Sequence, residues 1–214
     1  AGSNYGSTNK LICTKIKGDK VLYSALSNGG KSSQVIGVDI EGNDALMFIG
    51  DTTSSDITTG TIEQVVGVGI RKGTFTLSFC PCQGGKINQV IGVNIEGGDV
   101  LTNIGRISEV NQIIAAEIKG DDVLNDLAFN RGKVHYVHAE RIEGKTVFKC
   151  AGDHQGNNGV LVGVGIKTED IFNWRETSPN KPEYGTADRI ILYNCPPLSD
   201  HARMYAKHIV SGKE

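Results

Sequence analysis

Nearly the same nine residues occur twice in this chain, as QVIGVDIEG at 34–42 and as QVIGVNIEG at 89–97. They belong to a longer repeat, because an isoleucine with similar neighbours returns at intervals that are usually 23 to 25 residues. Such periods mark repeat architectures, in which each repeat is one unit that packs on its neighbours. These isoleucines define repeat position 0, and they are Ile16, Ile40, Ile70, Ile95, Ile118, Ile142, Ile166 and, less clearly, Ile190.

Within each repeat, apolar residues alternate at positions −4, −2 and 0, as in Ile36, Val38 and Ile40. A period of two is typical of a β-strand with one buried face. A glycine-containing segment such as KGDD at 119–122 follows, and this turn chemistry predicts a β-hairpin in each repeat. Small residues at position −3 predict close approach by another layer or by a large side chain. These residues are Cys13, Gly37, Gly67, Gly92, Ala115, Ala139, Gly163 and Ala187.

A longer period lies over the short one, since a shift of 102 residues places IKGDKVL at 16–22 on IKGDDVL at 118–124. We therefore predict an all-β fold of tandem β-hairpin repeats, about eight hairpins in two pseudo-equivalent halves. Each half would be a small sandwich, barrel or prism. The predicted units are a first β-repeat half at 1–104, a second at 105–198 and a short C-terminal helix at 199–212.

Composition excludes several classes of protein. The net charge is −2 with both signs interspersed, so no basic patch for nucleic acid is present. No apolar run approaches the roughly 20 residues that cross a bilayer. The chain begins AGSNYGSTNK without methionine, and we expect a secreted, extracellular protein. The odd number of cysteines leaves at least one thiol unpaired, and the disulfide candidates are Cys13, Cys80, Cys82, Cys150 and Cys195.

The sixth repeat departs from the pattern. It carries Tyr136, His138 and Glu140 where the other repeats carry aliphatic side chains. Departures from a repeat are places where function tends to lie, so these residues are candidate ligand-binding residues. The expected hairpin would also pair Glu140 with Lys149 as a cross-strand ion pair.

The same hairpin would bring His135 beside His154. This pair could bind a metal ion, or it could face solvent at the open end of the hairpin. Two further departures are CPC at 80–82, whose thiols could enter separate disulfides or bind a soft metal, and GDTTSSDITTGT at 50–61. We interpret the second segment as a polar surface loop.

No spacing of serine, histidine, cysteine or acidic residues matches a catalytic arrangement, so we predict a protein that is not an enzyme. No nucleotide cofactor is expected. The predicted function is a carrier of a small apolar ligand or pigment, held inside one half or between the two. Two alternatives stay open, a structural or matrix protein that self-associates and a bivalent carbohydrate-binding lectin.

Residues 18–97 resemble the small secreted insect proteins induced by gut pathogens, grouped with a silkworm multiprotein bridging factor. GDKVLYS at 18–24 and FTLSFCPCQGGKINQVIGVNIEG at 75–97 carry the resemblance. The chain departs from that family at MFIGDTT, 47–53, where the family has an Arg-Ala-Leu-Asp motif, and in the additional CPC cysteines. The resemblance implies a secreted, non-enzymatic, β-rich protein, and it carries over no catalytic residue.

Overall fold

The computed structural model describes residues 7–21, 31–43, 45–46, 60–76, 85–105, 108–151, 155–172, 186–198 and 206–212. These residues form ten β-strands and no helix. The strands are β1 (Ser7–Lys17), β2 (Lys31–Glu41), β3 (Thr61–Thr76), β4 (Lys86–Val100), β5 (Glu109–Val123), β6 (Lys133–Val147), β7 (Asn157–Val164), β8 (Lys167–Ile171), β9 (Thr186–Tyr193) and β10 (Ala206–Gly212).

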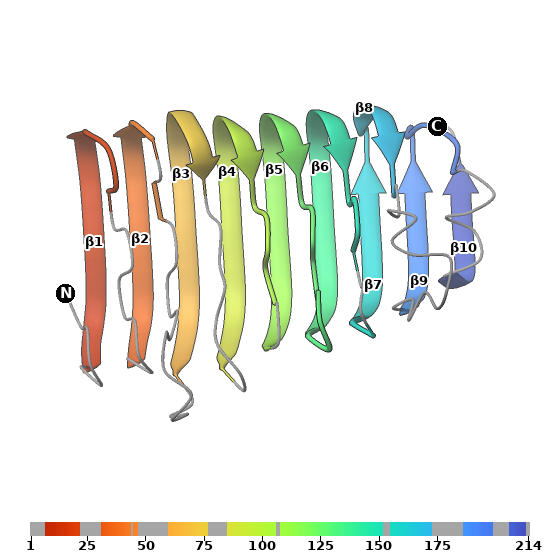
Figure 1. The fold of residues 1–214 in the computed structure, drawn as a ribbon, viewed down its shortest axis with the longest axis horizontal. Helices are drawn as coiled ribbons and strands as arrows, with labels where there is room; N and C mark the ends of the chain where they lie inside the picture. Colours follow the sequence, from red (N-terminus) through yellow and green to blue (C-terminus); the bar gives the residue numbers. More distant parts are fainter. Residues whose placement is uncertain are drawn as a thin grey trace.

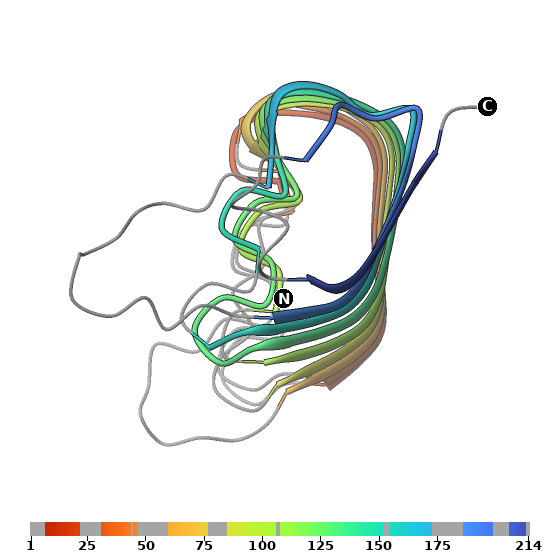
Figure 2. The same ribbon diagram turned by 90° about the vertical axis from the view of Figure 1, so that its right-hand side faces the viewer.

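The strands form one parallel sheet, ordered along the chain from β1 to β7 and then through β9 to β10 (Figure 1). β8 lies off this path and pairs with β6. Because neighbouring strands run in the same direction, the chain has to return across the molecule between them. Figure 2 shows the described returns on the opposite side of the interior from the flat sheet. The fold is therefore a parallel β-solenoid, in which each sequence repeat forms one rung of the stack.

The predicted tandem hairpins are wrong, and so are the sandwich, barrel or prism halves built from them. Every described strand pair is parallel. The glycines that suggested hairpin turns lie inside continuous strands, as Gly120 does in β5. A Cβ atom at Gly120 would lie 2.8 Å from the carbonyl oxygen of Gly98 in the preceding rung. Glycine is needed here because neighbouring backbones approach closely, and the strand continues without reversing.

A left-handed residue at position −1 changes which side chains face the interior. The φ angle at this position lies between 51° and 64° in eight rungs. The alternation therefore shifts before the isoleucine, and positions −5, −3 and 0 point inward. In β4, Val90 and Ile95 are buried, whereas Ile91 and Val93 are half-exposed. The expectation that positions −4 and −2 share the isoleucine face is wrong.

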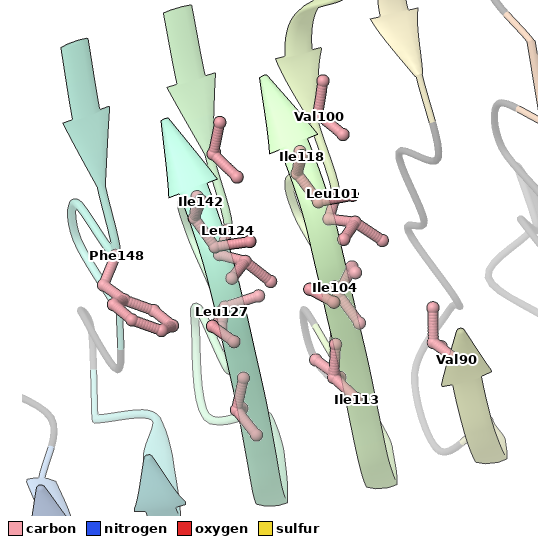
Figure 3. Packing of buried hydrophobic residues seen from close by; sticks show 14 of the residues in the cluster. Val90, Val100, Leu101, Ile104, Ile113, Ile118, Leu124, Leu127, Ile142 and Phe148 are labelled. Carbon is pink, nitrogen blue, oxygen red and sulfur yellow. The ribbon is translucent and has the colours of Figure 1, made fainter. Parts of the chain in front are cut away.

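The small residues at position −3 leave room for large side chains of the same rung. A Cβ atom on Gly92 would lie 3.1 Å from Leu101 Cδ1 and 3.2 Å from Ile95 Cδ1. Equivalent side chains of successive rungs then stack into columns, and Figure 3 shows the aliphatic ones between sheet and return. Phe148 stacks on Phe172 with ring centroids 4.8 Å apart. Side chains thus fill the interior between these rungs.

The predicted C-terminal helix at 199–212 is wrong where the structure describes it. Residues 206–212 form strand β10, which pairs in parallel with β9. Ile209 and Val210 are β-branched, which favours a strand, and the edge of β9 offers unpaired backbone groups. The register of β7 and β9 places Ile190 beside Leu161, at position −5. By the same register Cys195, and not Ile190, occupies position 0 in this rung.

The sheet continues across the predicted boundary between residues 104 and 105. Ile95 of β4 lies beside Ile118 of β5, the same register that joins other neighbouring rungs. None of the described residues forms a helix long and apolar enough to cross a membrane. Of the segment 50–61, only Gly60 and Thr61 belong to the described residues.

The predicted disulfides have no support in the structure. Cys13 and Cys195 are free thiols near opposite ends of the stack. Cys150 is buried. The pKa of the Cys195 thiol is raised, mainly because Cys195 is itself partly buried. Cys80 and Cys82 lie outside the described residues.

Candidate functional site

Positions −6, −4 and −2 of successive rungs lie on the same outward side of the sheet, and we call this surface the outer face. It is the flat side of the coil in Figure 2, and no described strand or return crosses it. The columns are Lys10, Gln34, Gln64, Gln89, Gln112, Tyr136, Val160, Arg189 and His208 at −6; Ile12, Ile36, Val66, Ile91, Ile114, His138, Val162, Ile191 and Val210 at −4; and Thr14, Val38, Val68, Val93, Ala116, Glu140, Val164, Tyr193 and Gly212 at −2.

The outer face is largely apolar. From β2 to β5, positions −4 and −2 carry only isoleucine, valine and alanine, all of them half-buried. The exposed large hydrophobic side chains among the described residues are Ile12 at 55%, Tyr193 at 40% and Val210 at 37%. All three lie on this face. Single exposed hydrophobic residues are ordinary, but a contiguous apolar surface marks an interaction site.

A ladder of glutamines borders the apolar columns. Gln34 Nε2 donates to Gln64 Oε1 at 3.0 Å, and Gln64 Nε2 donates to Gln89 Oε1 at 2.7 Å. Gln89 Nε2 in turn donates to Gln112 Oε1 at 2.8 Å. Each amide satisfies its neighbour, so the ladder ties β2 to β5 together and adds no net charge to the outer face.

The outer face is large enough for a specific contact. Strands stack about 4.8 Å apart and rise about 3.3 Å per residue, so nine strands and five positions span roughly 40 Å by 15 Å. The surface is therefore of the order of 600 Å². Because the −6 column is mostly polar, the apolar part is smaller than this, within the range of about 300–600 Å² for the largest apolar patch on an ordinary monomer, which is often functional.

The left-handed residue at position −1 forms a corner of the coil, and charged residues lie beyond this corner, at position +1. Their sign alternates from rung to rung, in the order Lys17, Glu41, Arg71, Glu96, Lys119, Glu143 and Lys167. Lys17 Nζ lies 2.8 Å from Glu41 Oε2, and Lys119 Nζ lies 3.4 Å from Glu143 Oε1. Opposite charges on adjacent strands favour this order of rungs. The corner thus separates the charged columns from the outer face.

The three candidate ligand-binding residues lie together on the outer face, in β6. On both sides, in β5 and β7, their neighbours in the three columns are aliphatic side chains, with the single exception of Gln112 in β5. His138 Nε2 lies 3.7 Å from Glu140 Oε2. β6 is the polar interruption within an otherwise aliphatic stretch.

The predicted ion pair of Glu140 with Lys149 is wrong, because β6 has parallel neighbours and forms no hairpin. Glu140 lies beside Ala116 of β5 and Val164 of β7. Its carboxylate contacts Arg141 Nη1. The carboxylate is therefore paired at the corner and not across a hairpin.

The histidine pair proposed for a metal is not formed by a hairpin. His135 lies at position −7 of β6, and His135 Nε2 is 2.8 Å from Glu109 Oε1. Lys86 and, secondarily, His135 lower the pKa of the Glu109 carboxyl through hydrogen bonds. His154 lies outside the described residues. Among the residues that are described, no group of three or more His, Cys, Asp or Glu side chains is arranged to hold a metal ion.

The chain matches no family model, no curated protein and no solved structure. The resemblance to the insect pathogen-response proteins stays a prediction. The candidate site therefore follows from the geometry of this chain alone. The sequence does contain its signal, since positions −4 and −2 form regular aliphatic columns, but strict alternation predicts that these columns face the core.

Proposed function

We propose that this protein is a non-enzymatic structural protein that self-associates through its outer face. The observation that carries this proposal is the column at −4, which is aliphatic from Ile12 in β1 to Val210 in β10 except for His138 and has exposed residues at both ends. The described strands and returns leave this apolar surface open, and removing such a surface from water is favourable. A partner with a flat apolar surface is therefore expected.

A second copy of the chain fits this surface best. Its side chains have the same spacing of about 4.8 Å between rungs, so ridges and grooves match along the whole length. Two outer faces would bury about 1,200 Å² together, which is the lower end of standard specific interfaces. A partner without this repeat would match only locally. We expect a dissociation constant of roughly 1–100 µM, because an interface of this size has few deeply buried anchors.

Sedimentation velocity from about 1 to 200 µM protein tests the proposal, with Val66→Lys as the disrupting variant. Val66 is half-exposed, so its replacement should leave the fold intact and bury a charge only in the associated state. We expect at least tenfold weaker association. Association driven by apolar contact should also persist or strengthen in 1 M salt, whereas charge pairing would weaken.

Asn94→Lys is the matched control. It adds the same charge in the neighbouring rung, but at the exposed position −1, where the first rung already carries Lys15 in the left-handed conformation. This variant should associate like the unaltered protein. A protein that is monomeric at every concentration, or equal effects of both lysines, would refute the proposal.

The carrier hypothesis keeps a place in the described chain, in a cavity of about 450 Å³ at the C-terminal end. It is lined by Leu192, Cys195, Pro196, Pro197, Leu198, Ile209, Ser211 and Gly212. These residues carry no charge, so the cavity suits a small neutral apolar molecule. The neutral dye N-phenyl-1-naphthylamine should then slow alkylation of Cys195 and leave that of Cys13, at the other end of the stack, unchanged. Equal alkylation of Cys195 with and without dye would exclude this second function.

A further inference from the structure

We infer that the two copies pack rung against equivalent rung, related by a two-fold axis parallel to the solenoid axis. This inference rests on the proposed self-association through the outer face. It adds the orientation of the copies and the residues that select it. Two-fold pairing of one surface with itself is the commonest symmetry of homo-oligomers.

In this arrangement the strands of the two copies run in opposite directions across the interface. The −4 column lies along the axis, so each of its residues meets its own counterpart, as Ile36 meets Ile36. The −6 column of one copy faces the −2 column of the other. From β2 to β5, the hydrogen-bonded glutamines thus cover valine or alanine side chains, and no charge is buried there.

Two pairs of polar residues on the outer face become partners in this arrangement, whereas His138, at −4, meets its own counterpart. The Tyr136 hydroxyl of one copy would face the Glu140 carboxylate of the other, a donor opposite a charged acceptor. In β9, the Arg189 guanidinium would face the ring of Tyr193, which allows a cation–π contact. Both pairs form twice because of the symmetry. The polar rung in β6 therefore selects the register, as a polar residue does in an apolar coiled-coil seam.

The opposite orientation lacks these pairs. A two-fold axis parallel to the strands and centred on β5 would also overlap the full length of both outer faces. It would place Glu140 against Val93 and His138 against Ile91. Glu140 would keep its contact with Arg141 there, but burying its carboxylate against an aliphatic side chain costs free energy that no new hydrogen bond offsets. The rung-to-rung arrangement avoids this cost.

Engineered cysteines distinguish the two orientations. Ile36→Cys should form a disulfide with its own counterpart under mild oxidation if equivalent rungs meet. In the opposite orientation, position 36 would face position 191, so only a mixture of Ile36→Cys and Ile191→Cys proteins would cross-link. Peptide mapping identifies the linked residues and separates them from native cysteines. Each reduced variant must still dimerise by sedimentation velocity.

The outcomes separate this inference from the proposed function. A disulfide that joins position 36 of one copy to position 36 of the other supports rung-to-rung packing. A link only between positions 36 and 191, in a protein that dimerises, overturns the inference and leaves self-association standing. A protein that stays monomeric removes both.

A double-mutant cycle tests the selecting pair. Tyr136→Phe and Glu140→Gln should each weaken dimerisation about tenfold, and the double variant should be no weaker than either single one. The two residues are four positions apart on one extended strand, so they cannot touch within one copy. Additive losses would therefore contradict a contact between copies.

Discussion

The left-handed residue at position −1 decides which side chains each rung buries. Lysine, aspartate, asparagine, glutamate, arginine and glycine all occupy it, in the left-handed region of φ. A side chain with a Cβ atom costs about 1–2 kcal/mol there, and asparagine less than most. Burial of the isoleucine that follows offsets this cost in the rungs from β2 to β7, since such burial contributes about 1.5–3 kcal/mol.

Gly165 isolates this backbone effect, because its φ is 63° and a Cβ atom there would meet nothing within 4 Å. Gly165→Val should lower the free energy of unfolding by roughly 1–2 kcal/mol through backbone strain alone. Gly165→Asn should lower it much less, as asparagine already stands at the equivalent positions 94 and 194. Urea denaturation measures both values. Equal losses for valine and asparagine would show that the left-handed conformation is not maintained at this position.

The same residues show where sequence analysis failed. The glycines and asparagines at position −1 are compatible with a corner, but Lys15, Glu117 and Arg141 give no local signal of one. If the corner is not recognised, strict alternation predicts that positions −4 and −2 face the core together with the isoleucine. The all-β class and the repeat were predicted correctly, whereas the hairpin pairing was wrong and the inward and outward faces were exchanged before the isoleucine.

At the scale of the strand, stacking in register brings like charges together as well as opposite ones. Asp99 in β4 lies beside Asp122 in β5. Burial, followed by the charges of Asp122 and Asp121, raises the pKa of the Asp99 carboxyl, and Lys149 opposes this shift. Asp122 is partly compensated, since it accepts a hydrogen bond from the Thr146 hydroxyl of the next strand.

The raised pKa of Asp99 makes the stability depend on pH. The folded protein binds this proton more tightly than the unfolded chain, so the free energy of unfolding falls as pH rises through the interval above about 3.9, the ordinary aspartate value. Asp99→Asn removes the charge and should raise stability at pH 7 while it reduces the difference between pH 4 and pH 7. Urea midpoints at both pH values check this result. A variant that is less stable than the unaltered protein at pH 7 would contradict it.

At the scale of the molecule, parallel strands made the difference between the expected and the observed fold. Strand content and repeat length are the same for a hairpin array and for a solenoid, so periodicity alone did not separate them. Gly120 and Gly144 looked like turn residues, yet they permit close contact between rungs. The candidate site was predicted in part, because Tyr136, His138 and Glu140 do share a surface. That surface is the outer face. It is formed by the parallel stacking of rungs that are far apart in the sequence, and no local sequence pattern encodes this stacking.

A stack of equivalent rungs should accept another rung, because each one contacts only its neighbours. Duplicating residues 109–132 in frame adds 24 residues, one full rung that repeats the register between β5 and β6. The longer protein should unfold in one transition, with a denaturant m-value about a tenth larger, since m follows the surface exposed on unfolding. Duplicating only 109–120 inserts half a rung and should prevent folding. The strands that follow would then lie beside the returns of the preceding rung, and their inward side chains would lose the columns on which they stack. Equal tolerance of both insertions would place this segment in a loop and remove the solenoid as its explanation.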